Sequence, residues 1–98
     1  MADIALSACT VKEYPTEATK VVIIRTAATV DAADVITPIT LSDYGITSLL
    51  SVEGFVHTTT DSVITSEAVT TSVTAGVLSV TIPAGTDDDV RVIRIEGY

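Results

Sequence analysis

The chain contains no tryptophan, asparagine or glutamine. Carboxamide side chains often read the edges of nucleic-acid bases, so base-specific recognition lacks two of its usual residues. Cationic side chains are also scarce, because five Lys and Arg residues face thirteen Asp and Glu residues, for a net charge of −8 at pH 7. An acidic surface repels phosphate backbones and anionic membranes. The composition therefore predicts no nucleic-acid partner and no membrane partner.

Cysteine and histidine each occur once. Cys9 cannot form a disulfide within the chain, and we expect it to pack as a small apolar side chain; a reactive or intermolecular thiol is the alternative. His57 is followed by Asp61 but by no nucleophile motif, which favours a histidine on a strand surface over a catalytic base. One histidine and one cysteine are too few for a tetrahedral zinc site. The chain is therefore predicted not to be an enzyme, with no catalytic residue, metal or cofactor.

Targeting signals are missing as well. The N-terminus MADIALSACTVKEYP has no basic segment of the kind that begins a signal peptide, and no apolar run approaches 18 residues. We expect synthesis in the cytoplasm without an export signal. A length of 98 residues predicts one domain. Residues 1–19 are assigned to an N-terminal segment or arm, and residues 20–98 to a single β domain.

Valine, isoleucine and threonine dominate what is present, and these β-branched side chains favour strands. Turn-forming residues recur about every 8–12 residues, which is typical of sandwiches and barrels. The sequence therefore predicts an all-β fold, a small β-sandwich or barrel of six to eight short, mainly antiparallel strands. Residues 76–83 (GVLSVTIP) illustrate the pattern, with Leu78, Val80 and Ile82 inward.

Two predicted strands contain residues that disturb a regular ladder. In residues 35–41, alternation places Val35, Thr37, Ile39 and Leu41 on one face, and Pro38 indicates an edge position or a bulge. In residues 46–58, Leu50, Val52 and Val56 share one face. Gly54 lies between them and indicates a bulge or the close approach of another backbone.

Residues 20–26 (KVVIIRT) and 90–95 (VRVIRI) are apolar on both strand faces. A two-layer sandwich has one interior, so a second apolar face favours contact with another molecule, and a homo-oligomer is predicted. Arg25, Arg91 and Arg94 are candidate interface anchors, because arginine pairs bidentately with carboxylates. Pairing with acids of the same chain is the alternative for all three.

Acidic side chains gather in two predicted loops. Asp87, Asp88 and Asp89 do not have the spacing of a calcium-binding loop and are expected to form a solvated hairpin tip. The sequence does not decide whether the loop at 87–89 binds an ion. Asp31 and Asp34 are expected to be turn residues, with an ion or interface site as the alternative.

Two runs, LSDYGITSLLSVEGFVHTTTDSVI and TSVTAGVLSVTIPAGTDDDVRVIRIEGY, resemble small β-rich virion structural proteins of tailed phages. Among these, the chain is most similar to capsid decoration or cement proteins. The likeness covers residues 20–98 and consists of short Val/Ile/Thr strands and a YGI turn before a central strand. It implies an oligomer on the outer capsid surface of the virion, with the major capsid protein and copies of itself as partners.

The preferred hypothesis is a non-enzymatic virion structural protein that stabilises the shell through contacts between subunits. The alternative is a small β-sandwich binding module that recognises carbohydrate or protein, for which Tyr44 and Phe55 would supply the aromatic contacts. Both residues are also candidate interface residues in the first hypothesis. Four aromatic side chains without tryptophan offer few platforms for sugar stacking.

Overall fold

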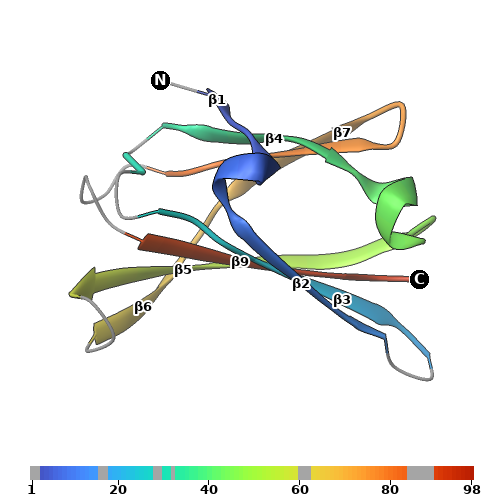
Figure 1. The fold of residues 1–98 in the computed structure, drawn as a ribbon, viewed down its shortest axis with the longest axis horizontal. Coiled ribbons are helices and arrows are strands. Elements are labelled where there is room, and N and C mark those ends of the chain that lie inside the picture. Colours follow the sequence, from blue (N-terminus) through green and yellow to red (C-terminus); the bar gives the residue numbers. More distant parts are fainter. Residues whose placement is uncertain (1–2, 16–17, 28–29, 32, 60–62, 84–89) are drawn as a thin grey trace.

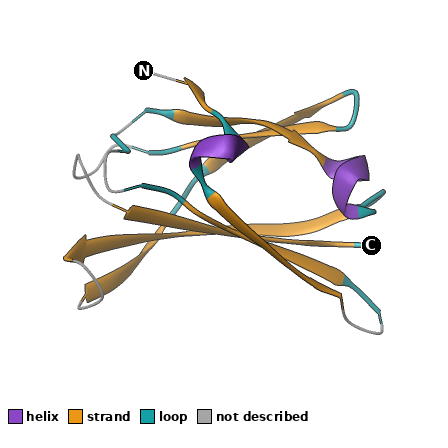
Figure 2. Ribbon diagram, viewed as in Figure 1, coloured by secondary structure: helices purple, strands orange, loops and turns teal. Residues whose placement is uncertain are grey.

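Two β-sheets pack face to face in the computed structural model of this chain (Figures 1 and 2). The structure describes residues 3–15, 18–27, 30–31, 33–59, 63–83 and 90–98. In sheet order, the four-stranded sheet contains β1 (Asp3–Ile4), β4 (Val35–Thr40), β8 (Val77–Thr81) and β7 (Thr70–Thr74). The five-stranded sheet contains β2 (Thr10–Pro15), β3 (Lys20–Arg25), β9 (Val90–Gly97), β5 (Leu49–Thr59) and β6 (Val63–Glu67). Two short 3₁₀ turns, η1 (Leu6–Ala8) and η2 (Leu41–Tyr44), complete the elements.

The predicted all-β sandwich is confirmed, and the described residues form nine strands, more than the six to eight predicted. Every strand pair is antiparallel except β1 and β4, which run parallel. The described part of residues 1–19 enters both sheets, because β1 pairs with β4 and β2 pairs with β3. No helix in the described ranges is long and apolar enough to cross a membrane.

The core is aliphatic and lies between the sheets. Alternate residues of each central strand point inward, and the prediction for residues 76–83 is confirmed, since Leu78, Val80 and Ile82 are each at most 1% exposed. Val22 and Ile24 from β3 and Ile93 and Ile95 from β9 face them from the other sheet. Ile36 and Ile39 of β4 lie beside them in the same sheet, and Val30 joins the core from the segment between β3 and β4.

An extra residue in β4 changes which side chains face the core. Ile36 pairs with Val80 and Ile39 with Leu78, so β4 advances three residues while β8 advances two. The bulge predicted from Pro38 is therefore present, and Pro38 is exposed at it. The predicted face of Val35, Thr37, Ile39 and Leu41 was wrong in its first half, because the extra residue inverts the alternation and buries Ile36 instead of Val35.

The same effect corrects the start of β5. Leu49 pairs with Gly97 and Ser51 with Glu96, so Leu50 is the extra residue at this point. Leu50 is 53% exposed, whereas Leu49 and Val52 pack against the core. The prediction that Leu50 shares the inward face of Val52 and Val56 was therefore wrong.

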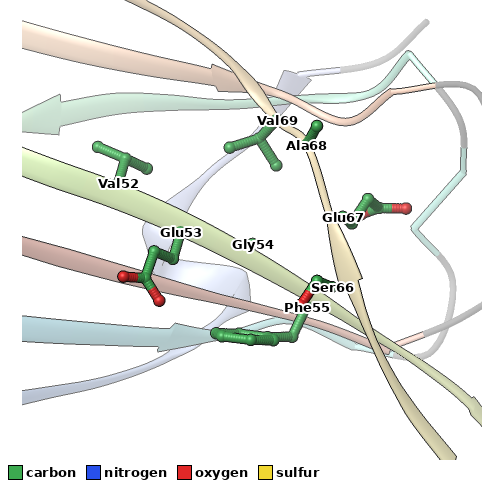
Figure 3. A pocket seen from close by; sticks show the side chains of 8 residues that line it. All are labelled: Val52, Glu53, Gly54, Phe55, Ser66, Glu67, Ala68 and Val69. Atoms are coloured by element: carbon green, nitrogen blue, oxygen red, sulfur yellow. The ribbon is translucent and has the colours of Figure 1, made fainter.

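Gly54 lies where the chain leaves β6 and crosses to β7 in the other sheet. A Cβ atom at Gly54 would lie 2.6 Å from Cγ1 of Val69 and 2.9 Å from the carbonyl oxygen of Glu67. Figure 3 shows the crossing segment passing beside this glycine. The close backbone approach predicted for Gly54 is therefore present, and the crossing needs a residue without a side chain there.

We expect Gly54→Ala to lower the free energy of unfolding by about 1–3 kcal/mol, because the added methyl group overlaps a backbone oxygen that cannot move independently. Urea denaturation monitored by circular dichroism measures the change. Ser51→Ala, on the opposite face of the same strand, is the control and should have a much smaller effect. Equal stabilities of the two variants would contradict the steric explanation.

Candidate interaction surface

The outer face of the five-stranded sheet is the candidate interaction surface, and we call it the basic sheet face. In Figure 1 this sheet is the lower layer, and no described element lies beneath it. Strand register and alternation assign the following residues to this face: Thr10, Lys12, Tyr14, Val21, Ile23, Arg25, Ser51, Glu53, Phe55, His57, Ser66, Val90, Val92, Arg94 and Glu96.

Three of the five basic residues of the chain lie on this face, one on each of the strands β2, β3 and β9. Ile23 pairs with Lys12 on one side and Arg94 on the other, so two cations flank one aliphatic side chain. Arg25 pairs with Val92, which in turn pairs with Phe55. Each cationic side chain therefore has an apolar neighbour on an adjacent strand.

The charge of this face differs from that of the remaining molecule. Its acidic side chains are Glu53 and Glu96, which leaves three cations against two anions, whereas the whole chain carries −8. Nη1 of Arg94 lies 3.5 Å from Oε1 of Glu96, and Oε2 of Glu96 accepts a hydrogen bond of 3.0 Å from the Thr19 hydroxyl. Arg94 remains 34% exposed, so it can still meet a carboxylate from another molecule.

The apolar side chains on this face are only partly covered. Val21 is 8% exposed, while Ile23, Val92 and Phe55 are half-buried. Lys12 and Arg25 are exposed, and the aliphatic stems of such side chains can cover neighbouring apolar groups while their charges stay in water. The second apolar face expected from the sequence is therefore present, and its apolar side chains are partly exposed to solvent.

The structure brings together three of the five predicted interface residues. Arg25, Phe55 and Arg94 lie on the basic sheet face. Lys12 and Ile23 join them there, and sequence reasoning missed both because their position depends on the β2–β3–β9 register.

Tyr44 lies in η2 and lines a recess of about 200 Å³ with Glu13, Tyr14, Lys20 and Val21, so this recess adjoins one end of the basic sheet face. Burial raises the pKa of Tyr44, and the negative charges of Glu13 and Asp43 add to the shift. Phe55 and Tyr44 therefore do not form the joint aromatic platform that a sugar site would need.

Arg91 lies on the inner face of β9 and is fully buried. The prediction that it anchors an interface was therefore wrong, and the alternative of pairing within the chain holds. Its Nε and Nη2 atoms each lie 3.4 Å from a carboxylate oxygen of Glu67, whose side chain is 8% exposed. Its Nη1 donates to the carbonyl oxygen of Val30. The guanidinium thus connects β9, the end of β6 and the segment between β3 and β4.

Thr26 fixes the backbone at the same point. Its hydroxyl accepts a hydrogen bond of 2.9 Å from the Arg91 amide and donates one of 3.0 Å to the Ala27 carbonyl. The Thr26 amide donates to the Arg91 carbonyl over 2.9 Å. Thr26 is 5% exposed, so these bonds form in the interior.

A recess of about 470 Å³ opens beside this ion pair, where β6 turns towards β7 (Figure 3). Its lining consists of Val52, Glu53, Gly54, Phe55, Ser66, Glu67, Ala68 and Val69. Figure 3 shows Glu53 and Phe55 pointing to one side of β5, and Val52 and Val69 to the other. Of the two carboxylates in this lining, Glu67 is paired with Arg91, and Glu53 points to the other side of β5 from Val52.

Cys9 and His57 are both half-buried among side chains and backbone of the fold. Cys9 is half-buried, its thiol donates to the Ala5 carbonyl over 3.6 Å, and burial raises its pKa above the ordinary value. His57 is half-buried on the basic sheet face, and its Nδ1 atom is buried without a hydrogen-bond partner within the described ranges.

Asp31 and Asp34 close a turn, as predicted, since the Asp34 carboxylate accepts a 2.9 Å hydrogen bond from the Asp31 amide. Asp87, Asp88 and Asp89 lie outside the described residues. No group of three or more potential metal ligands occurs in the described part of the chain.

We expect Glu67→Leu and Arg91→Met each to lower the free energy of unfolding by about 3–5 kcal/mol, because each leaves one charge buried without its partner. The double variant removes both charges and should recover at least half of the loss. Urea denaturation of the four proteins measures the coupling. A double variant less stable than both single variants would contradict this account.

Cys9 should react with iodoacetamide more slowly in the folded chain than in urea at pH 8, because the raised pKa keeps the folded thiol protonated. The rate should increase as pH rises through the folded pKa, above the ordinary thiol value. The same shift means that Cys9 contributes stability below the unfolded pKa and loses it as pH rises through the folded one. Equal rates in the folded and unfolded chain would refute this expectation.

Comparison of the chain with protein-family models, curated proteins and solved structures finds no match in any of the three. The surface described above therefore carries the functional argument.

Proposed function

We propose that this chain is a non-enzymatic virion structural protein that decorates a capsid shell and stabilises it by adding contacts between subunits. The observation that carries the proposal is the concentration of cationic and half-buried apolar side chains on one sheet face of an acidic molecule. In this role the basic sheet face docks against acidic side chains of the shell.

Charge supports this direction of docking. Lys12, Arg25 and Arg94 are spaced across three adjacent strands, so they can meet several carboxylates at once. Arginine forms charge-assisted bidentate hydrogen bonds with carboxylates, which gives orientation as well as affinity. The rest of the chain is strongly acidic and would be repelled by the same partner surface, so one orientation is favoured over the others.

The size of the face also supports a docking role. The molecule measures 34 × 26 × 22 Å along its principal axes. In Figure 1 the sheets stack along the middle axis, so the sheet face is bounded by the longest and the shortest extents. Such a face is of the same order as the roughly 800 Å² per partner that a standard stable interface buries. Ile23, Val92 and Phe55 would supply the apolar part of that contact, with the charged side chains around them.

A carbohydrate-binding module receives less support from the side chains. Phe55 and Tyr44 lie on different surfaces, and no tryptophan is available to stack on a sugar ring. Tyr14 and Tyr44 line one small recess, so the preference for a protein over a glycan rests mainly on the cationic side chains of the basic sheet face.

Mass spectrometry of purified particles from the producing cells tests the proposal. We expect peptides of this chain in a fixed ratio to the shell protein, and their absence from mature particles would end the proposal.

The docking face itself is tested by Arg94→Glu, with Lys20→Glu as the matched control. Both variants change the charge by the same amount. Lys20, however, points to the side of the sheet opposite to Arg94, and its ammonium group donates to the Gly45 carbonyl over 3.2 Å. Arg94→Glu should reduce the amount retained on particles about tenfold or more, because a carboxylate replaces a cation at the contact. Equal retention of the two variants would move the docking site to another surface.

A further inference from the structure

The open edge of β7 is a second surface that the proposed function does not use. β7 is the last strand of the four-stranded sheet, and all five of its residues are exposed. In Figure 1 the β7–β8 hairpin projects at the upper right, away from the basic sheet face. An exposed edge presents unpaired backbone groups to other strands.

The hairpin register shows which backbone groups these are. Thr74 pairs with Val77 across a two-residue turn, Ala75 and Gly76, that has positive φ angles of 52° and 78°. In such a hairpin the pair next to the turn is hydrogen-bonded, and the pairs then alternate. Thr71 and Val73 therefore direct their N–H and C=O groups away from β8, towards the open edge.

The other sheet edges carry features that hinder pairing with another strand. β2 contains Lys12 and Glu13 and ends at Pro15. β1 has two residues, and β6 ends at Glu67 and pairs with β5 across a register shift. Charged side chains, proline, short length and bulges are the usual protections of edge strands. β7 has none of them.

Charge selects a second copy of this chain as the occupant. Two molecules that each carry −8 repel one another, but residues 68–83 contain no charged side chain. The β7 edge is therefore a part of the surface where two copies can approach without placing carboxylates opposite each other. Val73, 49% exposed although it points inward like Leu78, would gain cover from the second copy.

We propose that two copies of this chain pair antiparallel along β7, with Ser72 opposite Ser72 of the second copy. In this register Thr71 of each copy faces Val73 of the other, so the outward N–H and C=O groups of both residues form four hydrogen bonds between the copies. If the central pair moved from Ser72 to Thr71, Val73 would have to pair with Val69, which packs against the core. If it moved to Val73, Thr71 would have to pair with Ala75, which belongs to the turn. The two four-stranded sheets become one continuous sheet.

The expected association is weak, because pairing of one five-residue strand buries less than the roughly 1,200 Å² of a standard interface. Sedimentation equilibrium from roughly 10 μM to 1 mM should show the mass rising from 10.2 kDa towards twice that value. Val73→Lys should keep the mass at that of one chain, whereas Arg94→Glu should associate like the unmodified chain. A constant single-chain mass, or unchanged association of Val73→Lys, would overturn the proposal.

A cysteine scan in a Cys9→Ala background tests the register. Ser72→Cys should form a disulfide-linked dimer under mild oxidation, because opposed residues of a non-hydrogen-bonded pair have Cα atoms about 4.5 Å apart, within disulfide range. Thr74→Cys is the matched control on the same face. Its two copies would lie about 13 Å apart, but mixing Thr74→Cys with Thr70→Cys should give a cross-linked pair. Equal cross-linking of Thr74→Cys alone would overturn the register.

This inference goes beyond the proposed function and does not depend on it. Loss of the Arg94→Glu variant from particles reports on the basic sheet face, whereas solution mass and cross-linking report on β7. Either result can therefore fail without the other.

Discussion

The buried Arg91–Glu67 pair is the constraint that joins β9, the end of β6 and the segment between β3 and β4. The core around it is built of valine, isoleucine and leucine, so a guanidinium there loses its water and must find its hydrogen bonds within the chain. It finds them on Glu67 and on the Val30 carbonyl, which belong to segments 24 and 61 residues away. The charge therefore specifies which segments meet, even where a pair of aliphatic side chains would give equal stability.

The crossing between the sheets follows from this contact. Glu67 is the last residue of β6, and the chain then passes over Gly54 on its way to β7. Because Glu67 is held by Arg91, the carbonyl of Glu67 lies against the position of the missing Gly54 side chain. The ion pair and the glycine are thus two parts of one arrangement, which lets the chain leave one sheet and enter the other within Ala68 and Val69.

Much of the fold follows from local composition, whereas the exceptions come from single inserted residues. Alternation in residues 76–83 predicts the core positions of β8 because that strand has no irregularity. The same reasoning fails at Val35 and Leu50, since Pro38 and Leu50 each add one residue that the partner strand lacks. Proline gives a sequence signal for such a bulge, but nothing about Leu50 distinguishes it from a regular strand residue.

The sequence predicts that an outer sheet face carries apolar and arginine side chains, but it does not predict which residues lie together on that face. Strand alternation places Arg91 and Arg94 on opposite faces of β9, as the sequence indicates, but it cannot tell which face is covered by the other sheet. That choice depends on strand order, which brings Lys12 beside Ile23 and Ile23 beside Arg94. The association of Arg25, Phe55 and Arg94 with Lys12 is therefore a property of the sheet and not of any one strand.

Charge distribution distinguishes the partners proposed for the basic sheet face and for the β7 edge. The basic sheet face combines three cations with half-buried apolar groups, so its charge complements an acidic surface better than it complements a copy of itself. The β7 edge has hydroxyl and methyl groups but no charge, and its backbone pattern is complementary to itself under a two-fold rotation. The proposal for the basic sheet face therefore calls for a different protein, and the proposal for the β7 edge calls for a second copy. Because they lie on different sheets, both contacts can form on one molecule.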